Sequence, residues 1–146
     1  MTAPGSRRMR VHSAATMALS AIAVVTVLAT EKPPETYVKL MKDTNTAAQA
    51  LRAHVQAKDY DAIAADGAAL KKLFADTEAF WSARRVEDAV GFSKTGAKAA
   101  ADLEVAAKAQ NEDGVATAAR GVNGTCMGCH TAHRERLPDG SSEIKH

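Results

Sequence analysis

Five consecutive residues near the C-terminus could do chemistry together: Cys126, Met127, Gly128, Cys129 and His130. Two cysteines three positions apart lie on one side of a helical turn, so each thiol can form a thioether with one vinyl group of the same haem. The next residue is then carried below the iron, where the imidazole of His130 can be the proximal ligand. C-x-x-C-H is the attachment signature of a c-type haem. The sequence therefore predicts one covalent haem c, with its iron, held by Cys126, Cys129 and His130.

Three other uses of this motif stay open. A thioredoxin-like redox pair needs βαβ surroundings, whereas this chain shows almost no strand pattern. A zinc ion could take Cys126, Cys129, His130 and His133, but four ligands from one short stretch of helix enclose a tetrahedral ion poorly. The chain has no third cysteine to complete such a site from elsewhere. A plain disulfide leaves the histidine without a role.

Residues 1–29 have the layout of a secretory signal peptide. Arg7, Arg8 and Arg10 form a basic start, residues 11–30 contain no Asp, Glu, Lys or Arg, and small residues permit cleavage after Ala29. The alternative is an uncleaved anchor, because the uncharged stretch is just long enough to span a bilayer. Export predicts a periplasmic location, and in bacteria the thioether bonds to haem are made outside the cytoplasm.

The charge of the chain changes when this leader is removed. The full sequence has a formal net charge of +2, and residues 1–29 hold three arginines and no acid. The remainder therefore carries about −1, and two haem propionates would lower it further. The basic balance of the whole chain is a property of the leader, so it indicates neither nucleic acid nor acidic lipid as a partner. We expect only modest electrostatic steering toward a redox partner protein.

The rest of the chain predicts an all-α fold. It is rich in Ala, Lys, Glu and Asp, and from residue 35 to residue 137 it contains no proline. Residues 30–34 are expected to be a linker, residues 35–137 a four-helix domain and residues 138–146 a flexible tail. The apolar periodicity and the cap residues predict helices over about 35–57, from the N-cap Asp59 to about 75, from a start between 76 and 87 to 110, and from the N-cap Asn111 to about 135.

Short loops between four helices predict an antiparallel up-down-up-down bundle. Aromatic residues make up only 4% of the chain, which is little material for a core of this size. A haem of several hundred Å³ would supply the missing apolar volume. The cofactor is thus expected to be part of the core.

In these features the chain resembles the class II cytochromes c, the cytochrome c′ family, whose four-helix bundles carry C-x-x-C-H near the C-terminus. The resemblance covers about residues 37–136. It rests on the motif followed by Arg134, on the pair Phe80-Trp81 ahead of the third helix, and on the segment 39–43 around Met41. His133 stands where the family has another aromatic residue. The resemblance implies a propionate contact for Arg134, a distal methionine as in low-spin members, and the option of a homodimer.

The distal ligand decides the expected function. Outside the leader, the methionines are Met41 and Met127, and Met127 is tied to the proximal side by the motif. Met41 lies within the apolar stripe of the first helix, where its alternative role is core packing. If Met41 binds, the iron is six-coordinate and suits outer-sphere electron transfer. If it does not, the protein resembles the five-coordinate members that bind NO or CO. We expect no enzyme, because no distal His–Arg pair is identifiable.

Overall fold

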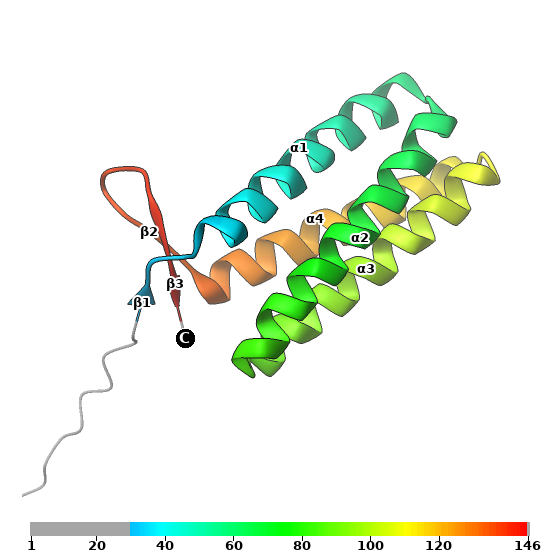
Figure 1. Ribbon diagram of the computed structural model, residues 1–146. Helices are drawn as coiled ribbons and strands as arrows, with labels where there is room; N and C mark the ends of the chain where they lie inside the picture. The colour runs from blue at the N-terminus through cyan, green and yellow to red at the C-terminus, as the bar shows by residue number, and fades with distance from the viewer. Residues whose placement is uncertain (1–29, 146) are drawn as a thin grey trace, which may run out of the picture.

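The computed structural model describes residues 30–145, which form four long helices and a small three-stranded sheet (Figure 1). The expected signal peptide, residues 1–29, lies outside the described part. Within that part, no helix combines the length and the hydropathy that crossing a bilayer requires. The helices are α1 (Glu35–Ala57), α2 (Tyr60–Arg84), α3 (Glu87–Lys108) and α4 (Glu112–His133), and the strands are β1 (Thr30–Glu31), β2 (Arg134–Arg136) and β3 (Ser142–Lys145).

Two helix starts follow directly from the sequence. The Asp59 carboxylate accepts a hydrogen bond from the backbone N–H of Ala62 at 3.1 Å, and the Asn111 side chain accepts one from Gly114 at 3.0 Å. Each of these N-caps satisfies a backbone donor that has no partner within its helix. Both predicted caps are confirmed. The ends of α1 and α2 are marked by Lys58 and Arg85, whose left-handed backbone stops the helix.

The second helix is longer than expected. We predicted an end near residue 75, but α2 continues to Arg84 and places Phe80 and Trp81 in its last turns. The buried stripe runs on through Phe74, Thr77 and Trp81, and the Thr77 hydroxyl donates to the carbonyl of Leu73 at 2.8 Å. That bond makes threonine acceptable on a buried face, because its polar group is satisfied within the helix. The third helix accordingly begins only at Glu87.

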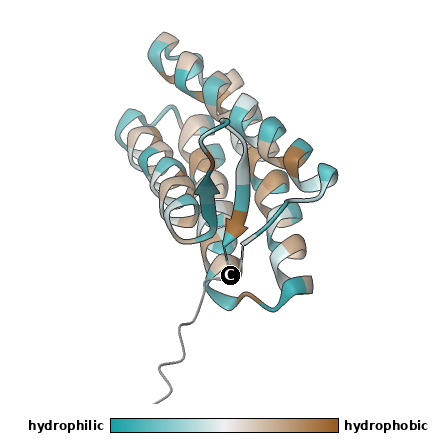
Figure 2. Ribbon diagram, turned by 90° about the vertical axis from the view of Figure 1, so that its left-hand side faces the viewer, coloured by the Kyte–Doolittle hydropathy of each residue, from teal (hydrophilic) through white to brown (hydrophobic). Residues whose placement is uncertain are grey.

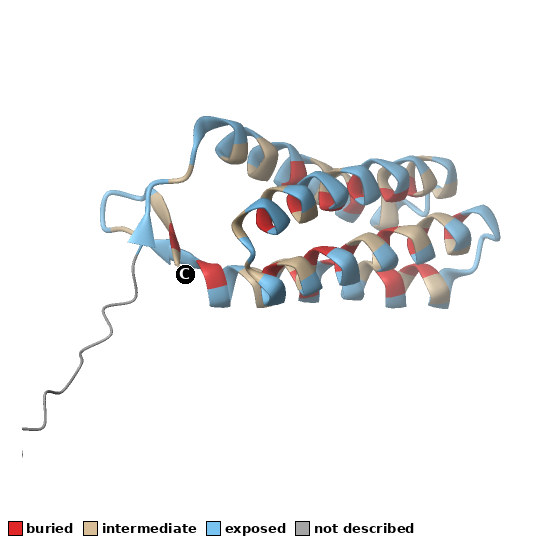
Figure 3. Cartoon of the chain, turned by 60° about the horizontal axis from the view of Figure 1, so that its bottom comes forward, coloured by how far each residue is buried: buried red, intermediate tan, exposed pale blue. Residues whose placement is uncertain are grey.

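The core lies along the inner sides of the four helices, where the buried residues of Figure 3 line up. Contact is most extensive between α2 and α3, where Gly67 lets the backbones approach: a Cβ at this position would lie 2.9 Å from the carbonyl oxygen of Ala100. Contact is sparse between α1 and α4. The packing therefore joins α2 and α3 tightly and leaves room between the first and last helices.

The C-terminal segment corrects two predictions. Instead of continuing to about residue 135, α4 ends at His133, and the chain enters β2. Instead of a flexible tail over 138–146, Ser142–Lys145 form the central strand of the order β1-β3-β2, antiparallel to both neighbours. Ile144 is buried against Trp81 and Ala89, and Figure 2 shows a hydrophobic stretch at the end of β3. The expected linker contributes β1 to the same sheet, while His146 lies outside the described residues.

Candidate cofactor site

A cavity of about 510 Å³ lies between α1 and α4, where these helices make few contacts. Its walls are mostly apolar, and no aspartate or glutamate lines it among the described residues. A second hollow, of about 970 Å³, continues it toward the β2–β3 hairpin. The two hollows share the following lining residues: Tyr37, Met41, Asn45, Cys129, His130 and Arg134.

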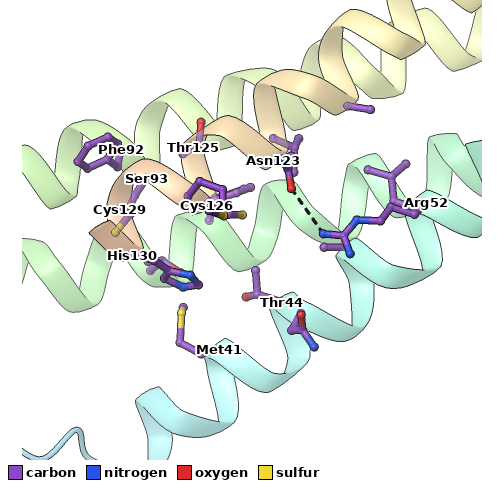
Figure 4. Close-up of a pocket in the computed structure, with 18 of the residues that line it drawn as sticks. Met41, Thr44, Arg52, Phe92, Ser93, Asn123, Thr125, Cys126, Cys129 and His130 are labelled. Atoms are coloured by element: carbon purple, nitrogen blue, oxygen red, sulfur yellow. Dashed lines mark hydrogen bonds between the residues drawn. The ribbon is translucent and has the colours of Figure 1, made fainter. Parts of the chain in front are cut away.

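The α4 wall of the cavity carries the attachment motif. Cys126 and Cys129 both line the cavity as free thiols, one turn apart on α4 (Figure 4). Burial raises the pKa of Cys129 to about 11 and also raises the pKa of Cys126, because the apolar walls disfavour a thiolate. Gly128 permits close packing behind the motif, since a Cβ there would lie 2.7 Å from the Phe92 ring. The motif is thus fixed against α3 with both sulfurs at the cavity.

The proximal candidate, His130, lies at the border of the cavity and is exposed on its outer side. Partial burial lowers its pKa, and the nearby Arg134 guanidinium lowers it further. Both effects favour the neutral imidazole, which is the form that binds a metal ion.

The α1 wall brings Met41 opposite this histidine. Figure 4 shows the Met41 side chain pointing from α1 toward the His130 ring. Around it the wall is largely apolar, with Tyr37 and Ala48 on the same face. The hydroxyl of Thr44, which also lines this wall, donates to the carbonyl of Leu40 at 2.8 Å, so its hydrogen is satisfied within the helix. Met127 lies on α4 with 60% of its surface exposed, which agrees with its exclusion as a distal group.

Two arginines border the cavity at opposite ends. Arg134, expected near a propionate, lines the cavity directly after α4, and its Nε donates to the Ser142 hydroxyl at 2.9 Å. Arg52 was not expected at this site. Its guanidinium donates to the Asn123 side chain at 3.5 Å and so links α1 to α4 (Figure 4). The sequence did contain a signal, because Arg52 lies three helical turns after Met41 on nearly the same face.

His133 has structural partners within the protein. It lies one helical turn after His130, within reach of a hydrogen bond near the proximal candidate or a haem propionate. In the structure it is 8% exposed, with Nε2 3.0 Å from the Asp88 carboxylate and Nδ1 3.4 Å from the carbonyl oxygen of Lys145. It therefore ties the end of α4 to α3 and to β3. Sequence reasoning missed this role because Asp88 and Lys145 are distant in the chain.

An aromatic cluster lies behind Tyr37, which lines the cavity. The Tyr37 and Phe80 rings are stacked with centroids 3.9 Å apart, and Trp81 meets both rings edge-on. The Arg84 guanidinium lies 3.6 Å from the Phe80 ring centre and covers it from the outside. Burial raises the pKa of Tyr37, so its phenol stays neutral beside the cavity. The early part of α1 is thereby anchored to α2.

The residues present fit a covalently held haem. A porphyrin needs an apolar space of several hundred Å³, thiols at one edge and axial donors on opposite walls. The cavity provides this volume, and its α4 and α1 walls provide Cys126, Cys129, His130 and Met41. Among residues 30–145, no three His, Cys, Asp or Glu side chains are grouped to hold a metal ion directly. The zinc alternative therefore gains no support from the arrangement.

Comparison with known proteins adds no family to this description. No protein-family model matches the chain, and no curated protein is significantly similar to it. The functional argument therefore depends on the residues and the geometry of the site.

Proposed function

We propose that this chain is an exported c-type cytochrome of the class II kind that transfers single electrons. In this proposal Cys126 and Cys129 hold haem c through thioethers, and His130 and Met41 are the axial ligands of its iron. One observation carries it: an imidazole that follows C-x-x-C faces a thioether across an apolar cavity. When bound, the haem supplies a one-electron Fe(III)/Fe(II) couple.

The side chains around the site act by holding and shielding. Burial raises the pKa of both thiols, which favours their protonated form. The methionine sulfur is a soft donor that favours Fe(II) and so raises the reduction potential. With His130 and Met41 both engaged, no position would stay open for a substrate, which suits electron transfer. Apolar floor residues such as Leu51 and Val122 exclude water from the interior.

The bundle topology forms part of the same proposal. Met41 near the start of α1 faces His130 near the end of α4, whereas Arg52 farther along α1 bonds to Asn123 earlier in α4. These two pairings favour an antiparallel arrangement of the first and last helices. The short turns between consecutive helices favour the up-down-up-down order of class II cytochromes.

The test is to produce the full chain in a bacterium that attaches haem in its periplasm. We expect a red periplasmic protein whose intact mass exceeds that of the polypeptide by one haem. The variant Cys126→Ser/Cys129→Ser serves as control. It removes only the two thiols, leaves Met127 and His130 of the motif unchanged, and should contain no covalent haem. A colourless wild-type protein with the mass of bare polypeptide would contradict the proposal.

The spectrum of the oxidised protein then decides between the two functions. A low-spin spectrum with a methionine–iron charge-transfer band at the near-infrared edge supports electron transfer. A high-spin spectrum that shifts on addition of NO or CO would instead identify a five-coordinate, gas-binding protein, and the role of Met41 would be withdrawn.

A further inference from the structure

Positive side chains without an ionic partner gather on one face of this protein. Most lysines and arginines of α2 and α3 are paired with acids, as in Lys72–Asp76, Lys98–Asp102 and Lys108–Glu104. Away from the two hollows, the cations that form no salt bridge with a described acid are Lys71 and Arg85. The remaining unpaired cations of the described residues border the hollows or the neighbouring turns of α1 and α4, and they are Lys32, Lys42, Arg52, Arg120, Arg134 and Arg136.

Four of these residues lie on α1, on α4 or directly after α4; three border the hollows, and the fourth lies one helical turn from the cavity wall. Lys42 lies one residue after Met41, and Arg52 borders the cavity farther along α1. On α4, Arg120 lies one turn before Asn123, and Arg134 follows the helix. We call Lys42, Arg52, Arg120 and Arg134 the cationic rim. All four are exposed.

The acids near this rim are paired with other cations or are outnumbered by the cations around them. Asp43 is paired with Lys39 at 2.6 Å, and Glu112 at the far end of α4 is paired with Lys58. Asp139 and Glu143 line the second hollow, where four cations outnumber them: Lys32, Lys42, Arg134 and Arg136. The surface around the cavity is therefore positive although the chain without residues 1–29 carries a formal charge of about −1.

An exposed apolar residue lies within the rim. Met127 has 60% of its surface accessible on α4, seven residues after Arg120 and seven before Arg134, which directly follows the helix. Seven residues are close to two helical turns, so the three side chains fall on one side of the helix. An apolar centre with a charged border is the usual composition of a protein docking site.

We propose that the cationic rim around Met127 is the docking surface for a redox protein with an acidic patch at its own electron-transfer site. The proposal rests on the function proposed above and names the chemistry of its partner. Two of the rim cations would suffice to pair with the two propionates of a bound haem, and the others would face the partner. The cavity is adjacent, so the partner would meet the protein where electrons leave it.

At physiological ionic strength, the charge near the docking surface affects an approaching partner more than the net charge of the protein does. The Debye length is about 8 Å at physiological salt, so an approaching partner senses the rim but little of the acids on α2 and α3. A membrane is the less suitable occupant, because among large apolar side chains only Val38, Val105 and Met127 are exposed in the described residues and they form no insertable stripe. Anionic vesicles are nevertheless part of the test.

The first experiment uses two small redox probes of opposite charge on the haem-loaded full protein. In each reaction one electron passes from the ferrous protein to the probe, giving hexacyanoferrate(II) from hexacyanoferrate(III), or the cobalt(II) complex from tris(phenanthroline)cobalt(III). We expect the rate with the anion to fall as salt is added and the rate with the cation to rise. Net charge alone requires the opposite slopes, and observing those would overturn the proposal.

Variants locate the effect on the surface. Lys42→Gln/Arg120→Gln should slow the reaction with hexacyanoferrate(III) by roughly 3- to 10-fold at low salt, since steering by local charge changes rates by 10-fold or more. Lys71→Gln/Arg85→Gln removes the same charge at two residues that border neither hollow and should leave the rate within about twofold. Equal effects of the two variants would contradict a localised docking surface.

A redox-inert probe gives a readout that does not depend on electron transfer. Paramagnetic hexacyanochromate(III) should broaden backbone amide signals of α1 and α4 around the rim and leave those near Lys71 and Arg85 sharp. Uniform broadening, or sedimentation with phosphatidylglycerol vesicles without rim broadening, would overturn the proposal. A protein without covalent haem refutes the function, whereas a red protein with the wrong salt slopes refutes the docking surface alone.

Discussion

Replacing Met41 by leucine separates an iron ligand from a core residue. Leucine has nearly the same volume but no sulfur, so the change removes a donor atom and conserves packing. Such swaps in a core usually cost less than about 1.5 kcal/mol. Met41 is only half-buried, and its burial is worth about 1 kcal/mol, or half the value of a fully buried side chain. The loss of stability that results from changed packing alone is therefore small.

The two roles differ most in the reduction potential. A packing residue stabilises the ferric and ferrous forms equally, so its loss shifts the potential little. A thioether ligand favours Fe(II), and its loss should lower the potential by about 100 mV or more, where 100 mV corresponds to about 2.3 kcal/mol per electron. That energy exceeds the packing contribution of Met41 and acts on one oxidation state.

The assay is a redox titration with absorption spectra of the oxidised and reduced Met41→Leu protein. We expect the methionine–iron charge-transfer band to vanish, the ferric spectrum to become high-spin, and the ferrous form to bind CO. The matched control is Met127→Leu, which changes the other methionine of the domain at an exposed position and should alter neither spectrum nor potential. If Met41→Leu keeps the wild-type spectrum and potential, the axial assignment is wrong.

Three further predictions concern the scaffold and are checked by denaturant unfolding. Gly67→Ala should lower the free energy of unfolding by about 1–3 kcal/mol, because the new Cβ meets a carbonyl oxygen of α3 at 2.9 Å. In the control Gly124→Ala the new Cβ meets nothing within 4 Å, and the free energy of unfolding should rise by about 0.5–1 kcal/mol. Ile144→Ala should cost about 2–4 kcal/mol and shift the fluorescence of Trp81 to the red; an unchanged protein would mean that β3 is not packed. Asn111→Ala should cost about 1 kcal/mol through its lost cap on α4, and a neutral result would refute that cap.

Local chemistry explains which parts of the fold could be predicted. The caps Asp59 and Asn111 act within three residues, so the sequence alone located the starts of α2 and α4. The helical period likewise placed Met41 on the inner face of α1, and the motif spacing placed both cysteines on one side of α4. The four helices are confirmed, while the ligand roles of these residues stay predictions.

The errors arose where distant segments decide the structure. Nothing local marks 142–145 as a strand, since Ile144 is its one large apolar residue and its burial depends on Trp81 and Ala89 far away in the chain. The length of α2 was underestimated for a similar reason, because Phe80 and Trp81 find their partner in Tyr37 of α1. His133 acquires its role only through Asp88 on α3.

The arrangement of contacts gives the ligands a structural role beyond electron transfer. The first helix packs on α2, which itself packs tightly on α3, but it barely touches α4 along the cavity. The contacts that do cross this space include the hydrogen bond from Arg52 to Asn123, which is long and solvent-exposed and so contributes little. A haem bonded to α4 through two sulfurs and to α1 through Met41 would fill the apolar space and join its two walls. The same bond that sets the potential would then also hold α1 in place, so oxidation state and the packing of α1 would be linked through a single sulfur.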